Sequence, residues 1–166
     1  MSNHDWSCFV VRVTVKASAK DLYKAWATRK GIEHWFLRLS EYKKPDGTLR
    51  GPNEYVEKDD NYRWLWHGWN DDTVETGSIL DCNGMDQLKF RFGPAGDCTV
   101  NIKTEEGENI VELIQENIPM DEKGMQYYHL GCKTGWTFYL ANLKSLMEGG
   151  VDLRNKNENI KRVINS

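Results

Sequence analysis

The chain lacks long hydrophobic runs, and no stretch approaches the roughly 18 consecutive apolar residues of a membrane-spanning helix. Its start, Met-Ser-Asn-His-Asp, carries no basic segment, and Arg12 interrupts the apolar residues 8–11, so we expect no secretory signal. Cysteines are few and widely spread: Cys8, Cys82, Cys98 and Cys132. We therefore expect reduced, buried thiols, a cytoplasmic location and no membrane span.

A basic excess is missing as well. Lysine and arginine together number 22, aspartate and glutamate 25, and the formal net charge is -3. A dedicated nucleic-acid-binding protein needs many cations to displace the counterions of the phosphates, so we expect no nucleic-acid partner. Disorder throughout is excluded by the seven tryptophans, seven tyrosines and five phenylalanines, which require a dry interior. We expect one domain over residues 1–154 and a polar tail over 155–166, either frayed or folded as a short helix.

Motifs for metal binding and nucleophilic catalysis are also absent. The sequence contains no Cys-x-x-Cys, no His-Glu-x-x-His and no Gly-x-Ser-x-Gly. We predict no metal, no cofactor and no catalytic residues, and we interpret His34, His67 and His129 as surface or hydrogen-bonded structural residues. Glu112 or Glu116 would present a carboxylate to the interior only if the even-numbered face of their strand points inward, which the pattern leaves open.

Two acidic pairs, Asp59-Asp60 and Asp71-Asp72, lie near turns, and we interpret them as solvated loop ends.

The first third of the chain has the pattern of a strand followed by two short helices. Residues 9–15 alternate apolar and polar side chains, which predicts a half-buried strand. Ser18 and Asp21 have the spacing of a helix-capping box, and apolar residues follow at helical spacing. Residues 32–36 resemble a second short helix with Trp35 and Phe36 facing inward.

From about residue 38 to 117 the pattern is typical of an antiparallel sheet. A polar stretch with the turn signals Pro45-Asp-Gly47 and Gly51-Pro-Asn53 predicts a loop. Further turn signals separate the strands that we predict at residues 62–69, 76–81, 87–92, 98–103 and 109–116.

The spacing then changes to that of a helix. From Tyr127 to Met147 apolar residues recur every three or four positions, which predicts one face of a long helix that Gly149-Gly150 ends. A long helix after an antiparallel sheet buries its apolar face on that sheet. We therefore predict an α+β domain in which a curved antiparallel sheet of six to seven strands wraps around a long C-terminal helix, with two short helices after the first strand.

A sheet that curls around a helix leaves space for a cavity between the two. Aromatic side chains from several predicted elements should surround that space, and we predict that they line a hydrophobic ligand site. These residues are Trp26, Trp35, Phe36, Trp64, Trp66, Phe90, Phe92, Trp136 and Tyr139.

The same segments resemble a known family. Gly31-Ile-Glu-His-Trp-Phe36 and Gly135-Trp-Thr-Phe-Tyr-Leu-Ala-Asn-Leu143, in this order of elements, resemble the START-like (Bet v 1-like, SRPBCC) superfamily. Within it, the chain is similar over residues 8–154 to the C-terminal domain of activators of the heat-shock protein 90 ATPase. The resemblance implies a helix-grip fold. Superfamily members bind lipids, sterols or polyketides, catalyse cyclisations or hydrolyses, or assist chaperones in the stress response.

We therefore predict a monomer that binds a small hydrophobic molecule, such as a lipid, a sterol or a polyketide-like compound. One alternative is a chaperone-associated domain that binds a chaperone partner. The other is an enzyme of the cyclase or hydrolase type. A cavity of several hundred Å³ favours ligand binding, and a carboxylate with a shifted pKa that faces the cavity favours an enzyme.

Overall fold

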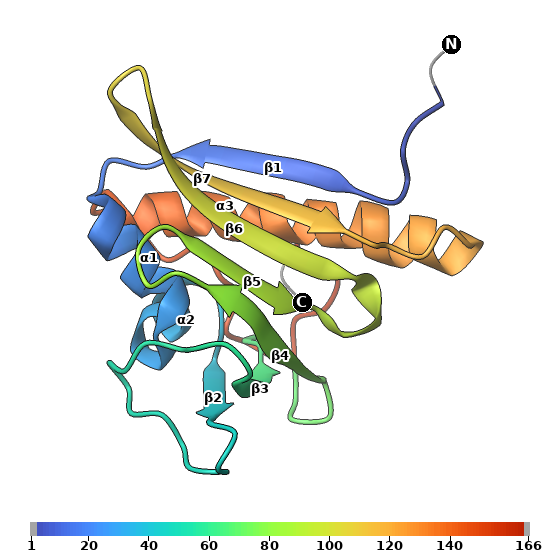
Figure 1. Ribbon diagram of the computed structural model, residues 1–166. Helices are drawn as coiled ribbons and strands as arrows, with labels where there is room; N and C mark the ends of the chain where they lie inside the picture. The colour runs from blue at the N-terminus through green and yellow to red at the C-terminus, as the bar shows by residue number, and fades with distance from the viewer. Residues whose placement is uncertain (1–2, 165–166) are drawn as a thin grey trace.

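In the computed structural model, which describes residues 3–164, seven antiparallel strands form one sheet in the order β1-β7-β6-β5-β4-β3-β2 (Figure 1). Successive strands from β2 to β7 are neighbours, and β1 pairs with β7, so β1 and β2 form the edges. The strands are β1 (Phe9–Thr14), β2 (Leu39–Lys43), β3 (Asn61–Leu65), β4 (Val74–Cys82), β5 (Gln87–Arg91), β6 (Asp97–Glu105) and β7 (Glu108–Glu116).

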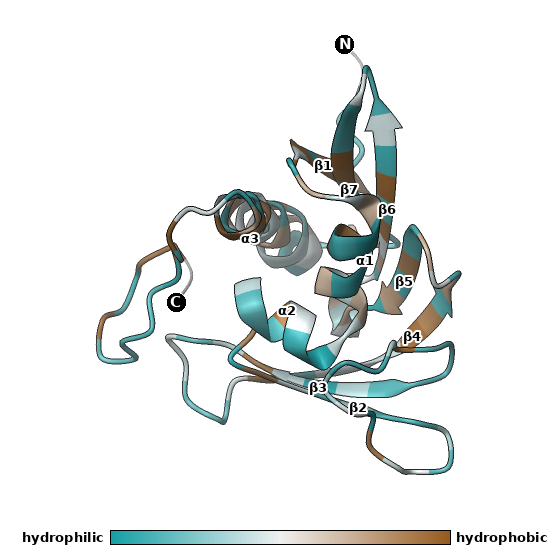
Figure 2. Cartoon of the chain, turned by 90° about the vertical axis from the view of Figure 1, so that its left-hand side faces the viewer, coloured by the Kyte–Doolittle hydropathy of each residue, from teal (hydrophilic) through white to brown (hydrophobic). Residues whose placement is uncertain are grey.

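Three α-helices lie on the concave side of the curved sheet (Figure 2). Two short ones, α1 (Ala19–Ala27) and α2 (Arg29–Trp35), connect β1 to β2, and the long α3 (Cys132–Met147) follows β7. A 3-10 turn, η1 (Gly93–Ala95), precedes β6, and a π-helical segment, η2 (Gly124–Gly131), runs directly into α3. This arrangement confirms the predicted α+β helix-grip fold.

Both short helices begin at side-chain caps. The Ser18 hydroxyl accepts a hydrogen bond from the Asp21 backbone N–H at 3.1 Å, which confirms the Ser18 half of the predicted capping box. The Thr28 hydroxyl accepts one from the Gly31 N–H at 3.0 Å and so starts α2. Each cap satisfies an N–H group that has no partner within its own helix.

The sheet differs from its sequence prediction at two places. Strand β2 was not predicted as a separate element, because it has five residues of which only Ser40 and Tyr42 are buried. The strand predicted over residues 62–69 ends at Leu65. The chain turns soon after this point, where Gly68 adopts a φ of +83° that side chains disfavour.

The odd-numbered face of β7 points toward the helices. Leu113 and Gln115 are buried there, whereas Glu112 lies on the opposite face and pairs with Lys103 at 2.8 Å and Arg12 at 3.2 Å. The hydrogen bond from Lys103 contributes most to lowering the pKa of Glu112. Glu116 pairs with Lys89 at 2.9 Å. The conditional hypothesis of an interior carboxylate from this strand is therefore wrong.

The predicted long helix is confirmed in its second part. Trp136, Tyr139 and Leu143 are buried, as their spacing predicts, and Gly149 ends the helix region with a φ of +80°. Residues 127–131, which the prediction included in one α-helix, belong to the π-helical segment η2. Among the described residues, no helix is long and apolar enough to cross a membrane.

Arg154 ties the segment after α3 to the end of α2. Its buried guanidinium donates hydrogen bonds to the backbone carbonyls of Glu33, His34 and Leu37 at 2.7–3.2 Å and pairs with Asp152 at 2.8 Å. The last carbonyls of a helix have no partner within the helix, so the guanidinium caps α2.

Asn142 of α3 makes a second tie between α2 and the segment after α3. From inside α3, its buried amide donates a hydrogen bond to the Trp35 carbonyl and accepts one from the Leu153 N–H, both at 2.7 Å. Beyond this point, the described residues 155–164 form turns without a helix.

Candidate ligand-binding site

Phe36, at the end of α2, lies at the centre of an aromatic cluster. Its ring centroid is 4.8–5.9 Å from those of five other rings: Trp35, Trp64, Trp66, Trp136 and Tyr139. Trp136 connects the remaining three predicted residues, with centroid distances of 5.9 Å to Trp26, 6.3 Å to Phe90 and 5.5 Å to Phe92. All nine aromatic residues singled out from the sequence therefore form one continuous cluster between the sheet and the helices.

Burial divides the cluster in two. Six members are at most 2% exposed: Trp26, Trp35, Phe36, Trp64, Phe90 and Trp136. Trp66, Phe92 and Tyr139 instead reach an open groove at one side of the cluster. The six buried rings pack against one another, so only these three of the nine line the groove. A ligand-binding role for the nine stays a prediction.

A buried amide fixes the ring of Trp136. The side-chain oxygen of Gln115, which is fully buried in β7, accepts a hydrogen bond from the Trp136 indole N–H at 3.0 Å. The Gln115 amide nitrogen donates to the Ala95 carbonyl at 2.9 Å. The sheet, η1 and α3 are joined through this one side chain.

The groove has a volume of about 610 Å³, and half of its lining residues are aromatic. It lies between the start of β4, the turn η1, the segment η2, the start of α3 and the end of the described chain. The residues that line it are Trp66, Trp69, Thr73, Glu75, Phe92, Pro94, Ala95, Tyr127, Tyr128, Cys132, Tyr139 and Ile164. The sequence did not identify Trp69 and Tyr127 as site residues. Trp69 lies after the end of β3 at Leu65, and Tyr127 lies in the π-helical segment η2 before α3, so neither follows the spacing of a regular strand or α-helix.

The carboxylate that lines the groove is Glu75 of β4, and not Glu112 or Glu116 of β7. It lies opposite Trp64 in the β3–β4 register, so both side chains point to the concave face. A Cβ atom on Gly93 would collide with Oε1 of Glu75, so the glycine makes room for the carboxylate. Burial raises the pKa of Glu75, against the opposing effect of the Thr76 N–H. In a strand every second residue faces the same side, so extending the predicted strand 76–81 backward from Ile79 would have placed Glu75 on the inward face.

Cys132 is the groove's thiol. Burial raises its pKa to about 11, against a lowering hydrogen bond with Gln115, and the nearby Glu75 raises it further. A thiol with such a pKa is protonated at neutral pH and is a poor nucleophile. All four cysteines are unpaired, as predicted, but only Cys98 is fully buried; the others are half-buried, which corrects the expectation for them.

The histidines lie outside the groove. His67 lines a neighbouring hollow of about 360 Å³ with Arg38 and Lys156. Burial and the positive charges of Arg154 and Lys156 lower the pKa of His67 to about 4, so the ring is neutral at pH 7.

His129 has a structural role in the N-terminal segment's contact with η2. Its buried ring lies 2.9 Å from the Trp6 carbonyl and 3.0 Å from Nε2 of His4. Since a carbonyl only accepts, Nδ1 of His129 donates to it. Among the described residues, no group of three or more histidines, cysteines and acids could hold a metal ion.

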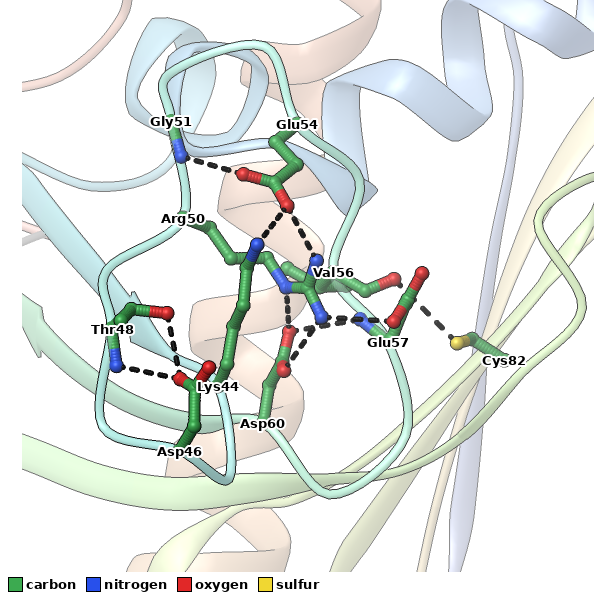
Figure 3. A network of polar contacts seen from close by, with 10 residues as sticks. All are labelled: Lys44, Asp46, Thr48, Arg50, Gly51, Glu54, Val56, Glu57, Asp60 and Cys82. Atoms are coloured by element: carbon green, nitrogen blue, oxygen red, sulfur yellow. Dashed lines mark hydrogen bonds and ion pairs between the residues drawn. The ribbon is translucent and has the colours of Figure 1, made fainter.

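A charge network in the loop between β2 and β3 is structural (Figure 3). The Arg50 guanidinium, which is 5% exposed, pairs with Glu54 at 2.8 Å, with Glu57 at 3.0 Å and with both oxygens of Asp60. Asp60 is fully buried, so the interpretation of this residue as a solvated loop end is wrong. Its charge is compensated by Arg50, and a buried ion needs such a partner.

The chemistry of the groove lining is mostly apolar. Among the described lining residues, Glu75 is the one acidic or basic side chain, the Cys132 thiol is protonated at neutral pH, and the aromatic rings offer apolar surface. General acid–base chemistry in a cyclase or hydrolase normally uses further positioned groups.

Comparison with known proteins gives one family match. The model for the family described as Activator of Hsp90 ATPase homolog 1-like protein matches residues 16–148. No match is found among curated proteins.

Several solved structures share the fold at low sequence identity. The protein SSP2350 from Staphylococcus saprophyticus has a TM-score of 0.68 and 19% identity, over 89% of this chain and 96% of its own. The Aha1 dimer from Colwellia psychrerythraea has a TM-score of 0.65 and 15% identity, over 86% and 97%. DynU16, from the dynemicin biosynthetic locus, has a TM-score of 0.66 and 16% identity, over 90% of this chain and 50% of its own. At these identities the likeness shows the fold alone.

Proposed function

The chain belongs to the Activator of Hsp90 ATPase homolog 1-like family, and from that premise we propose that it binds a small hydrophobic molecule in the aromatic groove. The observation that supports this proposal is the groove itself. Its volume of about 610 Å³ lies within the usual range for small-molecule sites, and apolar and aromatic side chains dominate its lining. A lipid, a sterol or a polyketide-like compound has the matching apolar surface.

The expected affinity is moderate. Burying roughly 300 Å² of apolar ligand surface contributes about 7 kcal/mol at about 25 cal/mol per Å². The loss of translational and rotational freedom opposes this gain, so we expect dissociation constants in the micromolar range.

A neutral ring compound gives the direct test. We expect 2-(2-naphthyl)ethanol to cause saturable two-dimensional NMR shifts at groove residues and to perturb tryptophan emission. Trp69→Ala removes a groove wall that is 40% exposed and should weaken binding several-fold. Leu49→Ala is the matched control, because Leu49 is an exposed apolar residue outside the groove. The same titrations with fatty acids, sterols and planar polyphenols then rank these ligand classes by affinity. Scattered shifts, or none with any compound at its solubility limit, would contradict the proposal.

The family description favours a second candidate, a chaperone-associated domain. For this role we expect the chain to bind a purified heat-shock protein 90 chaperone and to shift backbone NMR signals on one continuous surface. An absence of binding in calorimetry at micromolar concentrations would count against it.

A further inference from the structure

We propose that the groove selects ligands that carry a protonated amine next to an apolar ring system, with the Glu75 carboxylate as the counter-charge. This inference rests on the proposed ligand-binding function and adds the chemical class of the ligand.

The charge of the lining is one-sided. Among the described residues that line the groove there is no lysine, arginine or histidine, and Glu75 is the one carboxylate. Cys132 also lines it, with a thiol that stays protonated at neutral pH. A ligand with a positive group therefore complements this surface, whereas a carboxylate ligand would meet a like charge.

Glu75 is placed to receive such a group. Its side chain shares the concave face with Trp64, and the missing side chain of Gly93 leaves room for its carboxylate. No ion pair joins Glu75 to another residue in the part of the chain that the structure describes, although burial raises its pKa. An ammonium group would supply the missing counter-charge and form a charge-assisted hydrogen bond.

Two of the aromatic rings that line the groove each have a lysine ammonium group of the same chain over their face. Nζ of Lys123 lies 5.7 Å from the ring centroid of Tyr128, and Nζ of Lys161 lies 5.7 Å from a ring centroid of Trp69. The electron-rich faces of aromatic rings attract cations in this way. Neither lysine lines the groove, but both could attract a carboxylate ligand to its rim, so an acid is the competing occupant that the experiment must include.

Three ligands with one ring system separate these possibilities: 2-(2-naphthyl)ethylamine, 2-(2-naphthyl)ethanol and 2-naphthylacetate. Calorimetry at neutral pH and low salt should find the amine bound about tenfold more tightly than the alcohol, since only the ammonium group brings a positive charge to the partly buried carboxylate, whereas the alcohol donates a hydrogen bond without a counter-charge. The acid should bind most weakly of the three.

Variants assign the preference to one carboxylate. Glu75→Gln should bring the affinity of the amine close to that of the alcohol and leave the alcohol unchanged. Glu75→Asp, which keeps the charge, should retain part of the preference. Glu108→Gln removes an exposed carboxylate at the far end of β7 and should change neither affinity. Melting temperatures and NMR spectra of each variant verify its fold.

The outcomes are distinguishable. Binding of the alcohol without an amine preference, tighter binding of the acid, or an amine affinity that Glu75→Gln leaves unchanged would each overturn the inference while the proposed function stands. Binding of none of the three compounds would overturn both.

Discussion

The side-chain oxygen of Gln115 lies 3.0 Å from the indole nitrogen of Trp136, and this hydrogen bond joins the inner face of β7 to the first half of α3 inside the aromatic cluster. The same amide holds the Ala95 carbonyl beside the groove. Stability of the core and shape of the groove therefore depend on the same small set of side chains.

Trp136→Ala should destabilise the protein by about 3–5 kcal/mol, the usual cost of emptying a buried aromatic site. Trp136 is 2% exposed, and its loss also leaves the Gln115 oxygen without this donor. Urea unfolding measures the change, with Trp69→Ala as the comparison because Trp69 is 40% exposed. A loss below about 1 kcal/mol for Trp136→Ala would mean that this helix face does not anchor α3.

Thiol reactivity should separate the cysteines by burial. Cys98 and Cys132 should react most slowly in the folded protein, because burial raises the pKa of the Cys98 thiol well above its usual value and that of Cys132 to about 11. All four should react after unfolding in denaturant, and a reducing agent should leave the melting temperature unchanged. A marked drop on reduction would instead indicate a disulfide in solution and count against the predicted cytoplasmic location.

His67 should make folding stability sensitive to mild acid. Its pKa falls from an ordinary 6.5 to about 4 on folding, through burial and the charges of Arg154 and Lys156. Between pH 6.5 and about pH 4, His67 is therefore protonated in the unfolded chain but stays neutral in the folded protein. This contribution is fully present above pH 6.5 and is lost as the pH falls toward 4. His67→Gln lacks this titration, so its free energy of unfolding should fall less steeply between pH 6.5 and 4. Parallel pH profiles for the two proteins would refute the assignment.

Arg154→Ala should cost about 2–4 kcal/mol, because it removes charged hydrogen bonds to three carbonyls at the end of α2. Hydrogen exchange should show faster opening of α2 in particular. Arg154→Lys should restore only part of the stability, since an ammonium cannot reproduce the planar guanidinium geometry. Full stability in Arg154→Ala would show that water replaces the guanidinium without cost.

Local patterns were sufficient for most of the fold. The alternation of β1, β5 and β6 and the spacing of apolar residues in α3 report which side of each element is buried, and burial on one side determines how elements pack. That is why the nine aromatic residues, which come from five predicted segments, could be assigned to one cluster from the sequence.

The features that the sequence did not predict depend on contacts between residues far apart in the chain, or on short elements without a regular pattern. The burial of Asp60 depends on Arg50, and a pairing of that kind leaves no periodic pattern. The edge strand β2 is too short and too polar to be recognised. Glu75 lies near the start of a strand that begins at Val74, two residues before the predicted start, and element boundaries are the least reliable part of such predictions.

The pairing of β1 with β7 also has a consequence for the order of folding during synthesis. Phe9 hydrogen-bonds within a ladder whose other strand contains Gln115, so β1 leaves the ribosome long before its partner exists. Pairings that are so distant along the chain form late, because the loop between them must first be closed. The helix that covers the aromatic face is made after even β7. Until then the nascent chain lacks the helix that brings Trp136 and Tyr139 to the aromatic cluster, and this interval is when a folding helper would have most to bind.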